Sequence, residues 1–235
     1  MTRCMQAGPG NTSYYYPYAA PPPAAPPTPP ARSSSKSRYN PTRPRTLDKP
    51  IGTPPASLTW KVGDPIGFAG HATDAQDGTL PAGALSWSLI LHHCYTPSDC
   101  HTHLIQTFGG VSSGSFTAPD HAYPCWLELQ LTATDSGGLA ATTSVRLDPK
   151  TVVLTFKTNP GGLMLNDLVV NEASRTTPFS VTVVVGSANS VSAPSPQLFN
   201  KSTYNFVSWS DGGPQSHTIT APTVNTTYTA TYRKH

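Results

Sequence analysis

Histidine and cysteine side chains, which bind metals or form disulfides, are concentrated in one short stretch of this sequence. The stretch Leu91–His103 holds four of the eight histidines and two of the four cysteines. Neutral imidazole is a ligand for zinc and copper, and a cysteine pair forms either a disulfide or a thiolate metal site. Any specific chemistry in this chain is therefore expected to centre on this stretch.

The flanking residues predict the elements that hold it. An apolar run, Ser86–Leu91, leads in, and Leu104 with Ile105 leads out, whereas Pro97 and the polar residues after it favour a tight loop. The pattern predicts a strand, a turn and a returning strand.

Cys94 and Cys100 are close enough in sequence to bridge such a hairpin, and strand alternation then sets the side-chain positions. With these cysteines paired, His93 lies opposite His101 on the face away from the sulfurs. His103 shares that face, two residues further along. Three imidazoles are therefore expected to converge at one end of a sheet.

Three interpretations of the hairpin remain open. It is a disulfide-closed structural tip, a disulfide-braced zinc or copper site, or a site in which both cysteines bind metal as thiolates. In the second case the ligands are His93, His101 and His103, and His92 joins them only through a backbone bulge. The cysteine spacing is not the C-x-x-C of a zinc ribbon, and the sequence has no second pair of that kind.

Three acidic residues offer a different ligand chemistry. Asp74, Asp77 and Asp135 occupy turns that can fall at the same end of a β-sandwich, where their oxygens would suit Ca²⁺. Aspartate also caps turns through its own backbone, and the spacing matches no calcium loop. Turn capping is the favoured interpretation, and calcium is the alternative.

The composition and the distribution of charge argue against a nucleic-acid-binding protein. Charged residues make up only 11% of the chain, and the net charge is +3. The basic excess lies in residues 1–50, with seven basic side chains and one acid, whereas the remainder has eight basic and eleven acidic residues. The folded part is therefore mildly acidic, and no nucleic-acid partner is expected.

The sequence also bears on location. No apolar run approaches the roughly 18 residues of a membrane span, and the first ten residues lack the apolar region of a signal peptide. The abundant Ser, Thr, Gly and Pro are nevertheless typical of secreted all-β proteins. We expect an extracellular protein, and either a piece of a longer exported chain or a misplaced start.

Three segments are expected: 1–45, 46–149 and 150–235. The first is a disordered or polyproline leader, because residues 1–55 contain fourteen of the 26 prolines. The second predicts a two-sheet immunoglobulin-like sandwich with Trp87 as a core anchor. Its predicted strands are 58–60, 66–70, 86–92, 103–108, 114–117, 126–134 and 140–147.

The third segment predicts a second small all-β domain. Its predicted strands are 152–156, 163–165, 179–185, 190–193, 203–209, 217–220 and 226–232. The alternating Thr227–Tyr232 is typical of an edge strand, and Trp209 is interpreted as a core or turn anchor.

Several motifs of the second segment resemble a PKD-type immunoglobulin-like domain. They are Val62–Asp64, Phe68–Gly78, Leu85–Leu89, Tyr123 and Leu129–Leu139. The resemblance implies a β-sandwich, but the histidine–cysteine hairpin replaces the short turn of ordinary members. Phe206–Gly213 and Thr226–Tyr232 in turn resemble a bacterial repeat of the divergent internalin B-repeat type, which implies a small all-β spacer.

A narrower resemblance is to the C-terminal accessory region of secreted actinobacterial sugar dehydrogenases of the glucose/sorbosone type. The segments that carry it are Trp60–Asp64, Ala72–Pro81, Leu85–Cys94, Cys100–His103 and Ser113–His121. Those enzymes use pyrroloquinoline quinone on an upstream β-propeller, which this sequence lacks. The resemblance implies an accessory role beside such a catalytic domain, and not its activity.

No catalytic motif occurs in the sequence, whether G-x-S-x-G, a P-loop, G-x-G-x-x-G or H-E-x-x-H. We therefore expect a non-catalytic extracellular accessory or spacer module that associates with carbohydrate or a cell surface. The alternatives are a metal-binding module built on the hairpin and a purely structural spacer. No cofactor is expected beyond zinc, copper or calcium at the histidine and aspartate sites.

Overall fold

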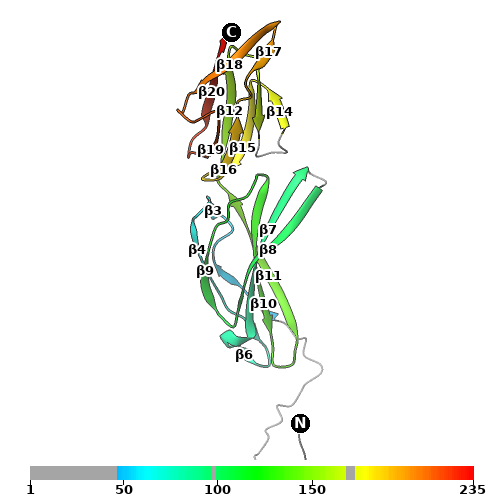
Figure 1. The fold of residues 1–235 in the computed structure, drawn as a ribbon. Helices are drawn as coiled ribbons and strands as arrows, with labels where there is room; N and C mark the ends of the chain where they lie inside the picture. Colours follow the sequence, from blue (N-terminus) through cyan, green and yellow to red (C-terminus); the bar gives the residue numbers. More distant parts are fainter. Residues whose placement is uncertain (1–46, 97–98, 168–172) are drawn as a thin grey trace, which may run out of the picture. The chain divides into compact units, whose positions relative to one another are not determined.

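The described part of the protein is built from β-strands. The computed structural model describes residues 47–96, 99–167 and 173–235 (Figure 1). These residues belong to one compact unit and form two hydrophobic cores. Apart from one short 3₁₀ turn, η1 (Ala82–Ala84), the regular elements of these residues are strands. The all-β prediction is confirmed, whereas the Pro-rich leader at 1–45 lies outside the described residues.

Two sheets enclose the first core. One has the strand order β3 (Thr59–Trp60), β11 (Ala140–Pro149), β10 (Cys125–Thr134), β7 (Leu85–Thr96) and β8 (Asp99–Gly109). The facing sheet has the order β2 (Ile51–Thr53), β4 (Pro65–Gly70) and β9 (Ser113–Thr117). A third, small sheet comprises β1 (Leu47–Asp48), β5 (Thr73–Asp74) and β6 (Gly78–Thr79). All seven strands expected here from the sequence are present, some longer than predicted.

The first core follows from strand alternation. On β10, Leu127, Leu129 and Leu131 are fully buried, and the residues between them are partly exposed. Trp87 packs on Phe68 of the facing sheet, with ring centroids 4.7 Å apart. The Trp87 indole N–H donates to the Val111 carbonyl at 2.9 Å, which satisfies its polar atom inside the core. Trp87 is thus a core anchor, as the sequence predicts.

Two further sheets enclose the second core. One has the order β15 (Phe179–Val184), β12 (Thr151–Asn159), β20 (Thr226–Lys234), β18 (Ser202–Trp209) and β17 (Gln197–Phe199). The other has the order β14 (Ala173–Thr176), β13 (Met164–Asp167), β16 (Ala188–Ser192) and β19 (Ser216–Thr220). Trp209 is buried, and its indole N–H donates to the Gln215 carbonyl at 3.1 Å, as expected of a core anchor.

One expectation for this region is wrong. β20 is the central strand of its sheet, paired parallel with β12 and antiparallel with β18, and not an edge strand. Tyr228, Ala230 and Tyr232 are buried, while the threonines between them occupy the opposite face. Alternation of this kind describes any strand with one covered face, so it does not distinguish an edge from the centre of a sheet.

No helix among the described residues combines the length and apolar character that crossing a bilayer would require.

Candidate functional site: a histidine cluster beside the first core

The β7–β8 hairpin carries the histidine–cysteine stretch. The two strands are antiparallel, with His93 opposite His101 and Cys94 opposite Cys100, which confirms the register predicted from the sequence. The register shifts between Cys94 and Thr96, next to the tip. The sulfurs of Cys94 and Cys100 lie 2.07 Å apart, at disulfide distance.

Four imidazole rings come together on the face away from the sulfurs. We call them the histidine cluster: His93, His101, His103 and His121. Four ring contacts form a closed circuit, in which the centroid distances are 5.1 Å for His93–His101, 4.7 Å for His101–His103, 5.5 Å for His103–His121 and 4.4 Å for His121–His93. The three histidines predicted to converge therefore do so, and a fourth joins them.

The fourth member, His121, is not among the metal ligands expected from the sequence. It lies on the loop between β9 and β10, and its Nδ1 is 3.2 Å from the Ala122 carbonyl oxygen, a contact with the backbone of the kind expected of a loop histidine. The same loop brings its ring against His93. Strand alternation carries no information about where a loop side chain lies. The sequence shows only that His121 lies shortly before Cys125, the first residue of β10.

His92 does not join the cluster. Its Nε2 donates to Glu128 Oε2 at 2.7 Å, and its ring stacks on Trp126 with centroids 4.8 Å apart. The Arg146 guanidinium in turn lies over the Trp126 ring, 4.3 Å from its centroid. Because His92 is directly followed by His93 in a regular strand, the two side chains point to opposite faces. His92 therefore lies on the sulfur face, as strand alternation predicts, and the backbone bulge that it would need to join the other ligands is absent at this position.

His93 is the innermost member of the histidine cluster. It is buried, with 4% of its surface exposed, because the residue opposite it on β10 is the buried Cys125. Burial lowers the pKa of His93 below its ordinary value, and the neighbouring histidines lower it further, whereas Asp99 acts in the opposite direction. His93 is therefore neutral at pH 7, the form in which an imidazole nitrogen can bind a metal.

Cys125 is a free thiol beneath the cluster. Burial, together with the negative charge of Asp120, raises its pKa to about 12. The thiol is thus protonated at neutral pH and behaves as a small apolar side chain.

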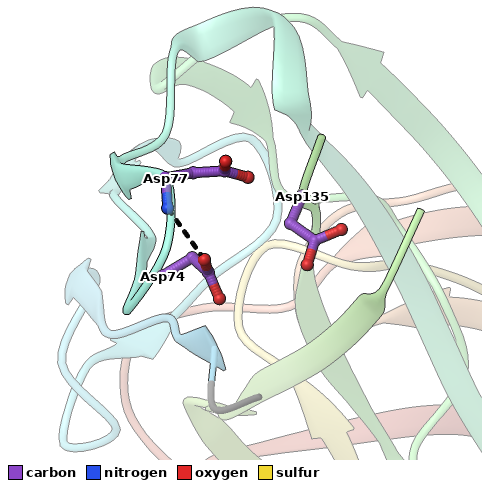
Figure 2. Close-up of side chains that lie close together, drawn as sticks. All are labelled: Asp74, Asp77 and Asp135. Carbon is purple, nitrogen blue, oxygen red and sulfur yellow. Dashed lines mark hydrogen bonds between the residues drawn. The ribbon is translucent and has the colours of Figure 1, made fainter. Parts of the chain in front are cut away.

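A second group of potential ligands lies at the other end of β10. Figure 2 shows Asp74 at the end of β5, Asp77 on the turn between β5 and β6, and Asp135 on the segment that follows β10. One carboxylate oxygen of each lies within 4.8 Å of the others, a spacing that an ion could bridge. The two turns that carry these residues therefore meet at one end of the sandwich, as the sequence predicts.

Hydrogen bonds account for these three carboxylates as turn acceptors. Asp74 Oδ1 accepts from the backbone N–H groups of Gln76 at 2.7 Å and Asp77 at 2.9 Å. Asp77 accepts from Ser136 N–H and from its hydroxyl, which ties the two turns together. Asp135 Oδ1 accepts from Leu139 N–H at 2.7 Å. The geometry favours turn capping, because Ca²⁺ would need most of these oxygens among its six to eight ligands.

An open hollow of about 470 Å³ adjoins the acidic turns. Its lining combines carboxylates and hydroxyls with small apolar side chains. The residues are Asp77, Leu80, Pro81, Gly83, Ala84, Thr134, Asp135 and Ser136. Its volume falls within the range of about 300–1,000 Å³ that is usual for small-ligand clefts.

Comparison with known proteins provides little further information. No family model and no curated protein matches the chain. Among solved structures, the crystal structure of Spo0M, a sporulation control protein from Bacillus subtilis, aligns with a TM-score of 0.30 and 12% sequence identity, covering 69% of this chain and 74% of Spo0M. A TM-score this low carries no argument about function.

Proposed function

We propose that this chain is a non-catalytic, extracellular accessory module that associates with carbohydrate, working beside a sugar-oxidising or polysaccharide-active catalytic domain. The resemblances to PKD-type and B-repeat-type domains and to dehydrogenase accessory regions support this proposal. A cysteine pair at disulfide distance on the β7–β8 hairpin is compatible with an oxidising compartment. The all-β fold is also the class to which such modules belong.

The observation that carries the proposal is the hollow beside the acidic turns. Asp77 and Asp135 place carboxylate oxygens at its wall, and a second lone pair on each can accept a hydrogen bond from a sugar hydroxyl. Leu80, Pro81 and Ala84 supply an apolar surface for the C–H face of a sugar ring. A shallow site of mixed character suits a weakly held glycan chain.

The test is retention of the full chain on a panel of immobilised polysaccharides, with and without Ca²⁺, beside two substituted chains. Gly83→Arg places a long side chain at the hollow, and a Cβ at Gly83 meets no atom within 4 Å, so the substitution starts without a steric clash. Gly161→Arg is the matched control in the turn after β12, where a Cβ would lie 4.0 Å from the nearest atom, the Thr158 carbonyl oxygen.

Retention that is lost in Gly83→Arg and kept in Gly161→Arg supports the proposal. Equal retention of both variants removes the hollow from the function. Absence of retention on every polysaccharide leaves the chain a structural spacer. A requirement for Ca²⁺ would show that the acidic turns bind an ion together with the sugar.

A further inference from the structure

The histidine cluster combines three strand residues and one loop residue in a single closed ring of contacts. His93 and His101 are opposite each other on β7 and β8, and His103 follows on the same face of β8. His121 completes the circuit by contacting both His103 and His93. Structural histidines on a sheet do not need such mutual contacts, and four together bring several potential ligand nitrogens into one neighbourhood.

We propose that the histidine cluster is a binding site for one divalent transition-metal ion of the copper–zinc type. Neutral imidazole is the common ligand of these ions. The site is separate from the hollow assigned to carbohydrate, because β10 begins beside the cluster and ends beside the hollow. Failure of either proposal leaves the other standing.

The spacing of the rings matches a shared ion. A metal–nitrogen bond of about 2.0–2.1 Å places each ring centroid about 3.2 Å from the metal. Two such rings at 90–109° about the ion then have centroids about 4.5–5.2 Å apart. The four contacts in the cluster measure 4.4–5.5 Å. The rings therefore already lie near the separation that coordination needs, with the 4.4 Å and 5.5 Å contacts just outside that range.

The orientation of the rings has to change on binding. Among the described residues, only the three aspartates form a group whose ligand atoms all lie within 4.8 Å of one another. The imidazole nitrogens must therefore turn towards a common centre by rotation about the side-chain torsions. The terminal torsion of histidine is broad, so this movement requires no change in the backbone.

The tautomer of His121 favours binding. The carbonyl oxygen of Ala122 can only accept, so His121 donates through Nδ1 and keeps the lone pair of Nε2 for a metal. A backbone carbonyl that fixes the tautomer of a ligand histidine is the usual second partner in metal sites.

The disulfide braces the site without entering it. Cys94 and Cys100 lie one residue from His93 and His101 and point to the other face of the hairpin. Their bridge holds the two strands in register, so less conformational entropy is lost when the rings converge on an ion.

The test is calorimetric titration of the full chain with Cu²⁺ and Zn²⁺ at pH 7.5. A Cys4→Ser background removes a thiol outside the described residues. We expect one ion per chain. Replacing a ligand should weaken binding at least as much as losing an outer-shell partner, which costs about 10–100-fold. His101→Gln and His121→Gln should both show this loss, and binding to the unsubstituted chain should weaken below about pH 6.

His92→Gln is the matched control, because His92 lies on the opposite face and bonds to Glu128. It should bind as tightly as the parent chain. Equal binding by parent, His101→Gln and His121→Gln would overturn the proposal, as would an equal loss in His92→Gln. Electron paramagnetic resonance of the Cu²⁺-loaded parent chain does not depend on any variant. Nitrogen splitting from at least three imidazoles is expected, and splitting from one or none would overturn the site.

Discussion

Adding a single methyl group at Gly114 should destabilise the first core. A Cβ built at Gly114 on β9 would lie 2.6 Å from Phe68 Cζ and 3.0 Å from its Cε1. Phe68 has no room to withdraw, because its ring packs against Trp87 at 4.7 Å and Phe108 at 4.8 Å between centroids. Overpacking of this kind costs about 1–3 kcal/mol. The reduced entropy of the unfolded chain offsets about 0.4–1 kcal/mol of this cost, so we expect the free energy of unfolding to fall by about 1–2 kcal/mol.

Gly67→Ala is the matched control. Gly67 lies on the paired strand β4, on its exposed face, and the nearest atom to an added Cβ is the Gly114 carbonyl oxygen at 3.9 Å. Gly67→Ala reduces the conformational entropy of the unfolded chain without introducing a clash in the folded state. Its free energy of unfolding should therefore rise by up to about 1 kcal/mol. Urea unfolding followed by tryptophan fluorescence measures both values.

A double variant isolates the cause. Phe68→Leu removes the ring edge that the new methyl group would meet, so the cost of Gly114→Ala should fall by about 1 kcal/mol or more in that background. If Gly114→Ala were as stable as Gly67→Ala, or if its cost were unchanged beside Phe68→Leu, the steric argument would be refuted.

Three further predictions concern the hairpin and its surroundings. Replacing both Cys94 and Cys100 by serine should lower the free energy of unfolding by about 2 kcal/mol, because the short closed loop restricts the unfolded chain, and intact mass with and without reduction and alkylation should show the bridge directly. Burial lowers the pKa of His93 in the folded protein, so its contribution to stability is complete above pH 6.5 and is lost as the pH falls through 6.5 towards the folded-state pKa, because the unfolded chain binds the proton more readily. The urea midpoint should therefore be lower at pH 5.5 than at pH 7.5, and the difference should be smaller in His93→Gln. Cys125 should resist a thiol reagent at pH 8 in the native protein and react at once in urea, measured in a Cys4→Ser chain, and rapid native reaction would contradict its burial.

The sequence was most informative where alternation and chemistry coincide. Leu127, Leu129 and Leu131 predicted both the strand and its buried face, because side chains of a strand alternate between two environments. The hairpin register followed from assuming that Cys94 faces Cys100, since one pair of opposite residues fixes all the others.

What the sequence could not supply was the position of segments without regular periodicity. His121 reaches the histidine cluster on a loop, and its position depends on how that loop turns before β10. The predicted strands also omit the short strands β1, β2, β5, β6, β14 and β17, since two to four residues carry too little pattern to identify. The place of β20 depends on which strands it pairs with, a property of the whole sheet.

The central position of β20 has a consequence for how the protein is made. Residues 226–234 are synthesised after every other strand of their sheet, yet they fill the gap between β12 and β18. Until they leave the ribosome, both neighbouring strands present open backbone edges, and the buried positions of Tyr228 and Tyr232 are empty. The five-stranded sheet of the second core therefore cannot be completed until β20 has emerged and joins two separate strand pairs, β15–β12 and β18–β17. Nascent chains at this stage are the ones that would need protection from edge-to-edge association.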